Sequence, residues 1–327
     1  MRCSLSTTKF NAVIPPAILI TLTALLLLAG CKAGGTNSAT DKELSNRRDF
    51  TDGIGRAVSI APNPRRVISL APNVTEILFA LGLGDRVVGV TSYCDFPEAA
   101  KTKEKVGDTL HPDLERIIAL KPDLVVVSTS SQLENLTQKL GQLAIPVYVT
   151  NPRTAREVTV SIRSLGEVTG AAARAAEIAG EMESRIGAVE QRVKDLPRPR
   201  VFYVLQTGPL ITAGRNTFIN DLINIAGGKS ISGDETADYP QFSRETVIAR
   251  APEVIVAPSS HGTELVKESD LRRDFATTPA IRSNRIVWVN PDLVDRPGPR
   301  IVEGLERLAE GLHPLGAQAP SPAGLPK

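Results

Sequence analysis

Side chains suited to metal binding are scarce in this sequence. Its three histidines are His111, His261 and His313, and three imidazoles with a carboxylate could in principle hold zinc or manganese. His313 precedes Pro314 in a segment that ends a helix, away from the loops that carry the other two. A bare zinc- or manganese-binding protein therefore stays open as a second alternative, and no residue is assigned to a metal.

Motifs for catalysis are absent. The sequence contains no phosphate-binding lysine loop, GxSxG, HExxH or CxxC, and Gly53-Ile-Gly55 lacks the third glycine of a dinucleotide-binding turn. Carboxylates are numerous, but none is spaced so that an acid and a base would meet. The sequence predicts a protein that is not an enzyme and needs no cofactor.

An internal repeat defines the elements that would carry a binding site. Residues 114–127 read LERIIALKPDLVVV and residues 244–257 read RETVIARAPEVIVA, at an offset of 245 − 115 = 130. In both copies an apolar-periodic stretch meets a proline step, which ends a helix, and an acidic residue leads into a β-branched run. Each copy therefore predicts a helix, a turn and a buried parallel strand.

The repeat extends in both directions. Residues 66–70 resemble residues 200–204, and residues 145–149 resemble residues 285–289. The pattern predicts two α/β lobes in series. In the first, Pro72-Asn73 is expected to open a helix, with Asn73 as its N-cap and Glu76 as the reciprocal partner.

A long helix is predicted between the lobes. Apolar residues recur at helical spacing from Ile178 to Leu196, so a single helix over 171–196 would span about 39 Å and form a stiff connection. The predicted organisation is a signal peptide (1–30), a flexible tether (31–48), an N-terminal lobe (49–152), the bridging helix segment (153–197), a C-terminal lobe (198–315) and a disordered tail (316–327).

The first segment has the features of an export signal. Basic Arg2 and Lys9 precede an apolar run that ends in Leu28-Ala29-Gly30-Cys31, which resembles a bacterial lipobox with Cys31 as the lipidated residue. Of the 38 basic side chains, 36 remain after these two are removed, against 36 acidic ones. A neutral mature chain argues against a nucleic-acid partner.

Several motifs together resemble a known family. They are RRVISLAPNVTEILFALG, VGVTSYCDFP, the repeated LERIIALKPDLVVV, YPQFSRETVIARAPEVIVA and RPGPRIVEGL. They resemble periplasmic binding proteins for iron chelates and vitamin B12, most closely the cobalamin-binding branch, over about residues 66–316. The resemblance implies an α/β fold with two Rossmann-like lobes joined by a single long α-helix and a ligand cleft between the lobes.

The resemblance also implies ligand-binding residues. Tyr93 and Tyr239 match aromatic cleft positions, and Asp292 and Arg296 match polar positions facing the ligand. Thr109, Ser128 and Ile211 stand where the vitamin-binding protein of enteric bacteria has aromatic rings. Thr109 and Ile211, together with His111 near Thr109, are also expected to contact the ligand. The cleft is thus less aromatic than in that protein. A corrinoid is the expected ligand, with a ferric siderophore or haem as the alternative.

The family's partner is a two-fold symmetric permease with its ATPase. In the family one glutamate on each lobe pairs with permease arginines, and Glu115 and Glu245 match those positions; helix N-terminal placement is their structural alternative. The chain is accordingly expected to be a monomeric, lipid-anchored extracytoplasmic protein of an ABC importer. Which membrane holds the anchor, which permease it serves and which chelate it carries are left open by the sequence.

Overall fold

The computed structural model describes residues 46–128, 133–259 and 266–314. The predicted signal peptide, the lipidation site Cys31, most of the tether, His261 and the tail from residue 316 lie outside these ranges. Within them, no helix is both long enough and apolar enough to cross a membrane.

The N-terminal lobe is built on a five-stranded parallel sheet in the order β5-β4-β3-β6-β7. Its strands are β3 (Val67–Ser69), β4 (Val87–Val90), β5 (Glu104–Lys105), β6 (Leu124–Ser128) and β7 (Val147–Thr150). Its helices are α3 (Pro72–Ala80), α4 (Leu114–Ala119) and α5 (Leu133–Gln142), with 3-10 turns at Gly84–Arg86 and Glu98–Thr102. The hairpin of β1 (Arg48–Thr51) and β2 (Ala57–Ile60) precedes it, so the end of the predicted tether at residue 48 coincides with the first strand.

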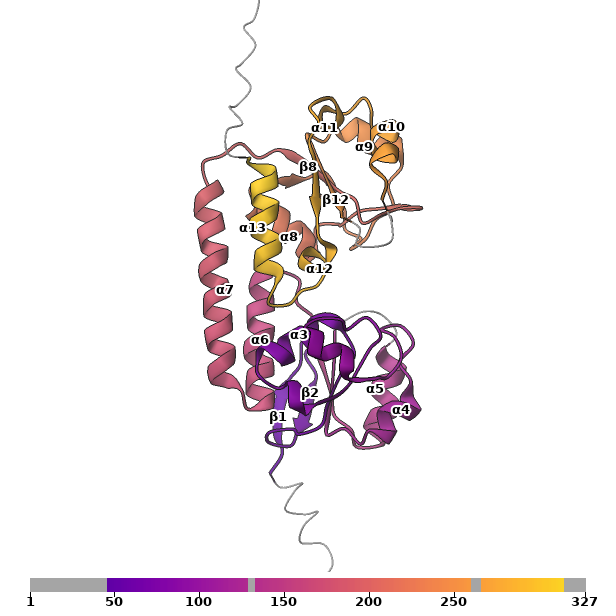
Figure 1. The fold of residues 1–327 in the computed structure, drawn as a ribbon, viewed down its shortest axis with the longest axis vertical. Helices are drawn as coiled ribbons and strands as arrows, with labels where there is room; N and C mark the ends of the chain where they lie inside the picture. The colour runs from indigo at the N-terminus through magenta and orange to yellow at the C-terminus, as the bar shows by residue number, and fades with distance from the viewer. Residues whose placement is uncertain (1–45, 129–132, 260–265, 315–327) are drawn as a thin grey trace, which may run out of the picture. The chain divides into compact units, whose positions relative to one another are not determined.

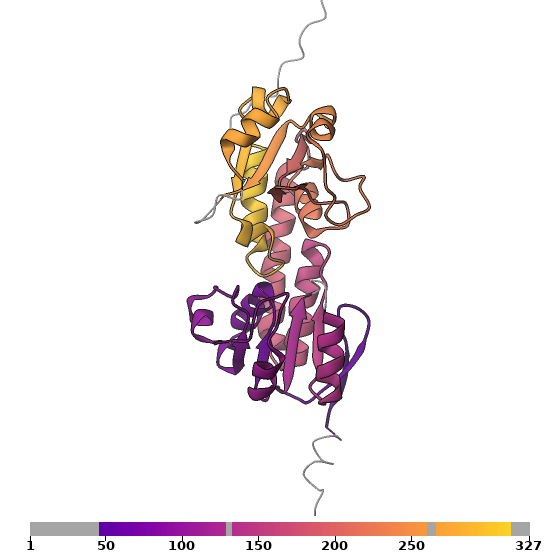
Figure 2. The same ribbon diagram turned by 90° about the vertical axis from the view of Figure 1, so that its right-hand side faces the viewer.

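The C-terminal lobe repeats this plan with a four-stranded parallel sheet in the order β11-β8-β12-β13. Its strands are β8 (Arg200–Tyr203), β11 (Lys229–Ser230), β12 (Val254–Pro258) and β13 (Ile286–Val289), with a small hairpin of β9 (Gln206–Thr207) and β10 (Leu210–Ile211). Its helices are α8 (Phe218–Ile225), α9 (Arg244–Arg250), α10 (Glu268–Asp274), α11 (Pro279–Arg282), α12 (Pro291–Val294) and α13 (Ile301–Leu312). The two α/β lobes, each built on a sheet of parallel strands, confirm the predicted fold class (Figures 1 and 2).

The repeated strands are buried on both faces. Alternate residues of β6 enter different apolar clusters: Leu124 and Val126 join a cluster that runs through both lobes, while Val125 joins one confined to the N-terminal lobe. In β12, Val254 and Ile255 divide in the same way. A strand whose two faces are both covered has no polar face, which explains why the sequence shows continuous β-branched runs.

Hydrogen bonds explain the polar residues of the repeat. Asp123 accepts hydrogen bonds from the backbone N–H groups of Arg65 and Arg66, and Glu253 accepts one from the backbone N–H of Arg200. The guanidinium of Arg200 in turn donates to the carbonyl of Ala251, as that of Arg66 does to the end of α4. Each acidic residue therefore fixes the start of its strand to the neighbouring strand.

The start of α3 differs from the prediction. Ala71 is the N-cap in extended conformation, Pro72 occupies the first turn, and Asn73 is already helical, with no capping bond. Pro favours the first helical position, which moves the cap one residue ahead of Pro72. Asn73 instead donates to the Pro297 carbonyl, and Glu76 pairs with residues of the other lobe.

The bridging segment 153–197 holds the predicted long helix and a second helix before it. Helix α6 (Ala155–Thr169) ends at Gly170, which has a left-handed φ of 77° and would clash with Asn63 if it carried a Cβ. Helix α7 (Ala172–Val193) follows, packs along α6, and continues beside α13 of the C-terminal lobe (Figure 1). The predicted stripe is buried from Ile178 to Val193, whereas Leu196 lies beyond the helix and is exposed.

Candidate functional site

A cavity of about 530 Å³ lies between the two lobes. The N-terminal lobe lines it with residues that end or follow strands β3, β6 and β7, among them Ala71, Ser128 and Asn151. The C-terminal lobe contributes Tyr239, Asp295 and other loop residues. Loops beyond the carboxyl ends of parallel strands are where open α/β sheets bind ligands.

Two ion pairs cross between the lobes beside this cavity. Arg153 of the N-terminal lobe contacts Asp238 of the C-terminal lobe at 2.6 Å, and Arg296 of the C-terminal lobe contacts Asp95 of the N-terminal lobe at 2.6 Å. Partial burial opposes ionisation of Asp95, but the hydrogen bond and charge of Arg296 hold its pKa below the usual value. Each lobe thus supplies one arginine and one aspartate to the pairing.

A third, more buried ion pair also joins the lobes. Glu76 on α3 accepts two hydrogen bonds, at 2.9 and 2.7 Å, from the guanidinium of Arg300 at the start of α13. Only 2% of the Glu76 side chain is exposed, and the Arg300 guanidinium lies 3.9 Å from the centre of the Phe96 ring. This contact fixes α3 to the first turn of α13.

Asp295 places an ionisable group in the cavity wall. Its carboxylate accepts a 2.5 Å hydrogen bond from the hydroxyl of fully buried Tyr203. Among the described residues it has no ion pair, because the adjacent Arg296 turns toward Asp95 and Asp292. Burial is the main cause that raises the pKa of Asp295 to about 6. The hydrogen bond from Tyr203 lowers this pKa, and the nearby negative charge of Asp292 raises it further.

Three of the residues predicted to bind ligand line the cavity: Thr109, Tyr239 and Arg296. Burial, followed by the charges of Asp295 and Asp238, raises the pKa of Tyr239. Ser128, noted for its departure from an aromatic residue, lines it too.

The other predicted ligand residues lie elsewhere. Tyr93 is 58% exposed and is not among the described residues that line the cavity. His111 is also exposed and bonds to Asp108. Ile211 lies in the β9-β10 hairpin, and Asp292 forms an ion pair with Arg296. Their roles toward a ligand remain predictions.

Four of the charged or polar residues that line the cavity were missed by the sequence reasoning. They are Arg153, Asp238, Asp295 and Asn151. Each had a local signal, because Asn151 and Arg153 directly follow strand β7 and the two aspartates adjoin Tyr239 and Arg296. Some residues that follow strand ends therefore indicate a ligand site even where they do not match a ligand-binding position of the family.

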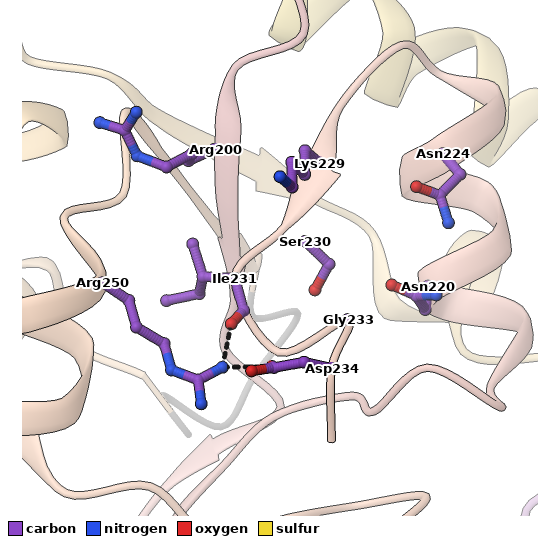
Figure 3. Close-up of a pocket in the computed structure, with 9 residues that line it drawn as sticks. All are labelled: Arg200, Asn220, Asn224, Lys229, Ser230, Ile231, Gly233, Asp234 and Arg250. Carbon is purple, nitrogen blue, oxygen red and sulfur yellow. Dashed lines mark hydrogen bonds and ion pairs between the residues drawn. The ribbon is translucent and has the colours of Figure 1, made fainter. Parts of the chain in front are cut away.

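A second hollow, of about 570 Å³, lies in the C-terminal lobe beside β11 (Figure 3). Arg200, Lys229 and Arg250 give it a basic rim. Both guanidinium groups are engaged: Arg250 bonds to Asp234, Glu235 and the Ile231 carbonyl, and Arg200 bonds to the end of α9. The hollow includes none of the predicted ligand residues, so the cavity between the lobes is the better candidate.

Histidines do not assemble a metal site in the described part of the chain, where no group of three or more potential ligands occurs. His111 lies in a loop of the N-terminal lobe, and His313 ends α13, where its ring packs against Gly227. His261 lies outside the described residues.

Comparison with known proteins decides the family. The chain matches the model of the periplasmic binding protein family over residues 67–293. It belongs to that family. This binding protein is 33% identical, over 89% of its length and 96% of the relative's, to an uncharacterized ABC transporter substrate-binding lipoprotein of Bacillus subtilis. The family prediction is therefore confirmed.

Other relatives have named ligands. The binding protein is 32% identical to a vitamin B12-binding protein of Vibrio parahaemolyticus, over 78% of its own chain and 92% of that protein. It is 30% identical to a cobalamin-binding protein of Halobacterium salinarum, over 93% and 85%.

Solved structures give the same fold. The periplasmic vitamin B12 binding protein of Vibrio cholerae superposes with a TM-score of 0.70 at 29% identity, covering 76% of this chain and 97% of that one. A periplasmic haem-binding protein of Roseiflexus gives 0.69 at 29% identity, covering 76% and 98%.

Proposed function

We propose that this binding protein captures a corrinoid in the cavity between its lobes and delivers it to the permease of an ABC importer. The observation that carries the proposal is the combination of that cavity with relatives named for vitamin B12 or cobalamin binding over most of the chain. Capture and release need no bond to be made or broken, so the protein is a carrier and not an enzyme.

The charges of the cavity favour a corrinoid over haem. Haem carries two propionate groups, which would need unpaired cations, whereas Arg153 and Arg296 are both paired with aspartates. Asp295 adds a carboxylate without an ion pair of its own among the described residues. The corrin ring instead carries neutral amide side chains, whose N–H groups can donate to such carboxylates. Tyr239 supplies an aromatic surface for the ring.

Calorimetry with cyanocobalamin, haemin and a ferric siderophore tests this proposal. We expect submicromolar binding of cyanocobalamin, equivalent to more than about 8 kcal/mol, and much weaker binding of the other two. Tight haemin binding with no response to cyanocobalamin would assign the protein to the haem-binding branch. A protein that retained only zinc, by elemental analysis, would support the bare-metal alternative.

Delivery requires a membrane anchor and a docking surface. We infer that Cys31 carries lipid on the extracytoplasmic side and that a monomer docks through Glu115 and Glu245. Both carboxylates lie at the starts of repeated helices, are exposed, and form no ion pair within the described part of the chain. A two-fold symmetric permease would meet one glutamate on each lobe.

Stimulation of transporter ATPase activity measures docking. Glu115→Ala with Glu245→Ala should abolish stimulation while cyanocobalamin affinity is retained. Glu181→Ala, which removes an exposed carboxylate from α7, is the control and should stimulate normally. Normal stimulation by the double variant would remove both glutamates from the docking site.

A further inference from the structure

Most repeated residues of the two copies have a role inside their own lobe. Asp113 caps α4 and Ser243 caps α9 at the equivalent position, each accepting a bond from the backbone three residues on. Ile117 and Val247 are the buried residues of these helices. Asp123 and Glu253 tie the strands together, as described above. These residues account for the fold of the repeated unit.

Three repeated positions are exposed rather than buried, although Glu245 also bonds to Ser243 and to its own backbone N–H. They are Glu115, Ile118 and Ala119 in the first copy, and Glu245, Ile248 and Ala249 in the second. All six are exposed, and Ile118 and Ile248 each expose 38% of their surface. Residues at spacings of three and four lie on one face of a helix. Each lobe therefore presents the same small face, which we call the acid–isoleucine face.

The two faces point away from the core that the lobes share. Ile117 and Val247 bury α4 and α9 against the separate cluster of each lobe, not against the cluster that contains α7. Figure 1 shows both helices on the side of their lobes away from α7. Neither face contributes to the cavity between the lobes.

We propose that the isoleucines and alanines of the acid–isoleucine faces contact the permease together with the glutamates. This inference rests on the proposed function. It requires a partner that offers, twice, a cation beside an apolar recess. The exposed carboxylate without an ion pair would meet the cation, the isoleucine would fill the recess, and the short alanine would let the surfaces approach closely.

The partner favoured by these observations is a dimer of identical subunits, not one asymmetric chain. A single exposed isoleucine on a protein surface needs no explanation. Here the same side chain has the same exposure at equivalent positions of two lobes, in each case one helical turn from an exposed glutamate. An asymmetric partner would give no reason for the second face to match the first.

The proposal is tested in an importer whose ATPase is stimulated by the wild-type protein. ATPase activity is measured against increasing concentrations of Ile118→Ser, Ile248→Ser and the double variant. Burying the exposed part of each isoleucine corresponds to roughly a tenfold change in affinity, so each single variant should raise the half-maximal concentration about tenfold. The double variant should raise it about a hundredfold, because distant sites act additively. Val160→Ser with Leu143→Ser, which are exposed outside the faces, should change it less than threefold.

Three results would overturn the inference. They are a double variant that behaves like the control pair, a loss confined to one lobe, or a wild-type dimer in solution that the double variant converts to monomer. Cyanocobalamin binding measured on the same samples excludes misfolding. Failure of the wild-type protein to stimulate any importer would instead count against the proposed function.

Discussion

Replacing Asp295 with asparagine should make the protein more stable at neutral pH. A carboxyl pKa raised from the usual 3.8 to about 6 corresponds to about 3 kcal/mol of unfavourable free energy when the group is ionised in the folded protein. The asparagine side chain would keep an oxygen for the 2.5 Å bond from Tyr203 but would carry no charge. At roughly 2 to 4 °C per kcal/mol, the gain in Tm is roughly 6 to 12 °C.

The pH dependence of this gain identifies its cause. Because the folded-state pKa of Asp295 is raised, its contribution to stability is complete below about pH 3.8 and is lost as the pH rises to about 6. Thermal unfolding followed by circular dichroism should show the full gain for Asp295→Asn at pH 7.5 and little gain at pH 4. Asp195→Asn, which removes an exposed carboxylate between α7 and β8, is the control and should show no gain. An equal gain at both pH values, or none at pH 7.5, would refute the reasoning.

Three further predictions concern the junction of the lobes. Glu76→Gln leaves the guanidinium of Arg300 without its buried charged partner. It should lower the free energy of unfolding, measured in urea, by about 3 kcal/mol. A loss below about 1 kcal/mol would mean that water replaces the contact. Arg153→Gln removes the 2.6 Å pair with Asp238 and should accelerate cyanocobalamin release in stopped-flow chase experiments, whereas an unchanged rate would show that the pair does not hold the bound state closed. Tyr239→Ala should weaken cyanocobalamin binding at least tenfold by calorimetry, and unchanged affinity would remove the ring from the site.

Local sequence rules predicted the elements because the relevant interactions are local or repeated. The proline steps at Pro122 and Pro252 ended α4 and α9, and the β-branched runs after them became β6 and β12. The long apolar stripe after Gly170 predicted a helix over 171–196, which the structure has as α7, but helix α6 before Gly170 was not predicted separately. The duplicated plan and the long helix were thus predicted from the sequence, and the helix that precedes the long one was not.

Contacts between distant residues could not be predicted in the same way. Glu76 looked like a capping residue because Asn73 lies three positions before it, yet its partner Arg300 is 224 residues away. Local rules also do not predict where a loop side chain points. Tyr239 lines the cavity, whereas Tyr93 is exposed and is not among the described residues that line it. Positions at strand ends were predictable, and their pairings across the lobes were not.

The two copies of the repeat differ at one pair of positions that line the cavity and agree at two exposed positions on α4 and α9. At the same offset of 130, Thr109 corresponds to Tyr239, and both line the cavity with unlike side chains. On α4 and α9, by contrast, Glu115 and Ile118 recur unchanged as Glu245 and Ile248. A ligand without two-fold symmetry needs different groups from each lobe, whereas a two-fold symmetric permease needs the same groups from both. This difference and this identity fit the proposed function, in which the protein carries an asymmetric ligand to a symmetric partner.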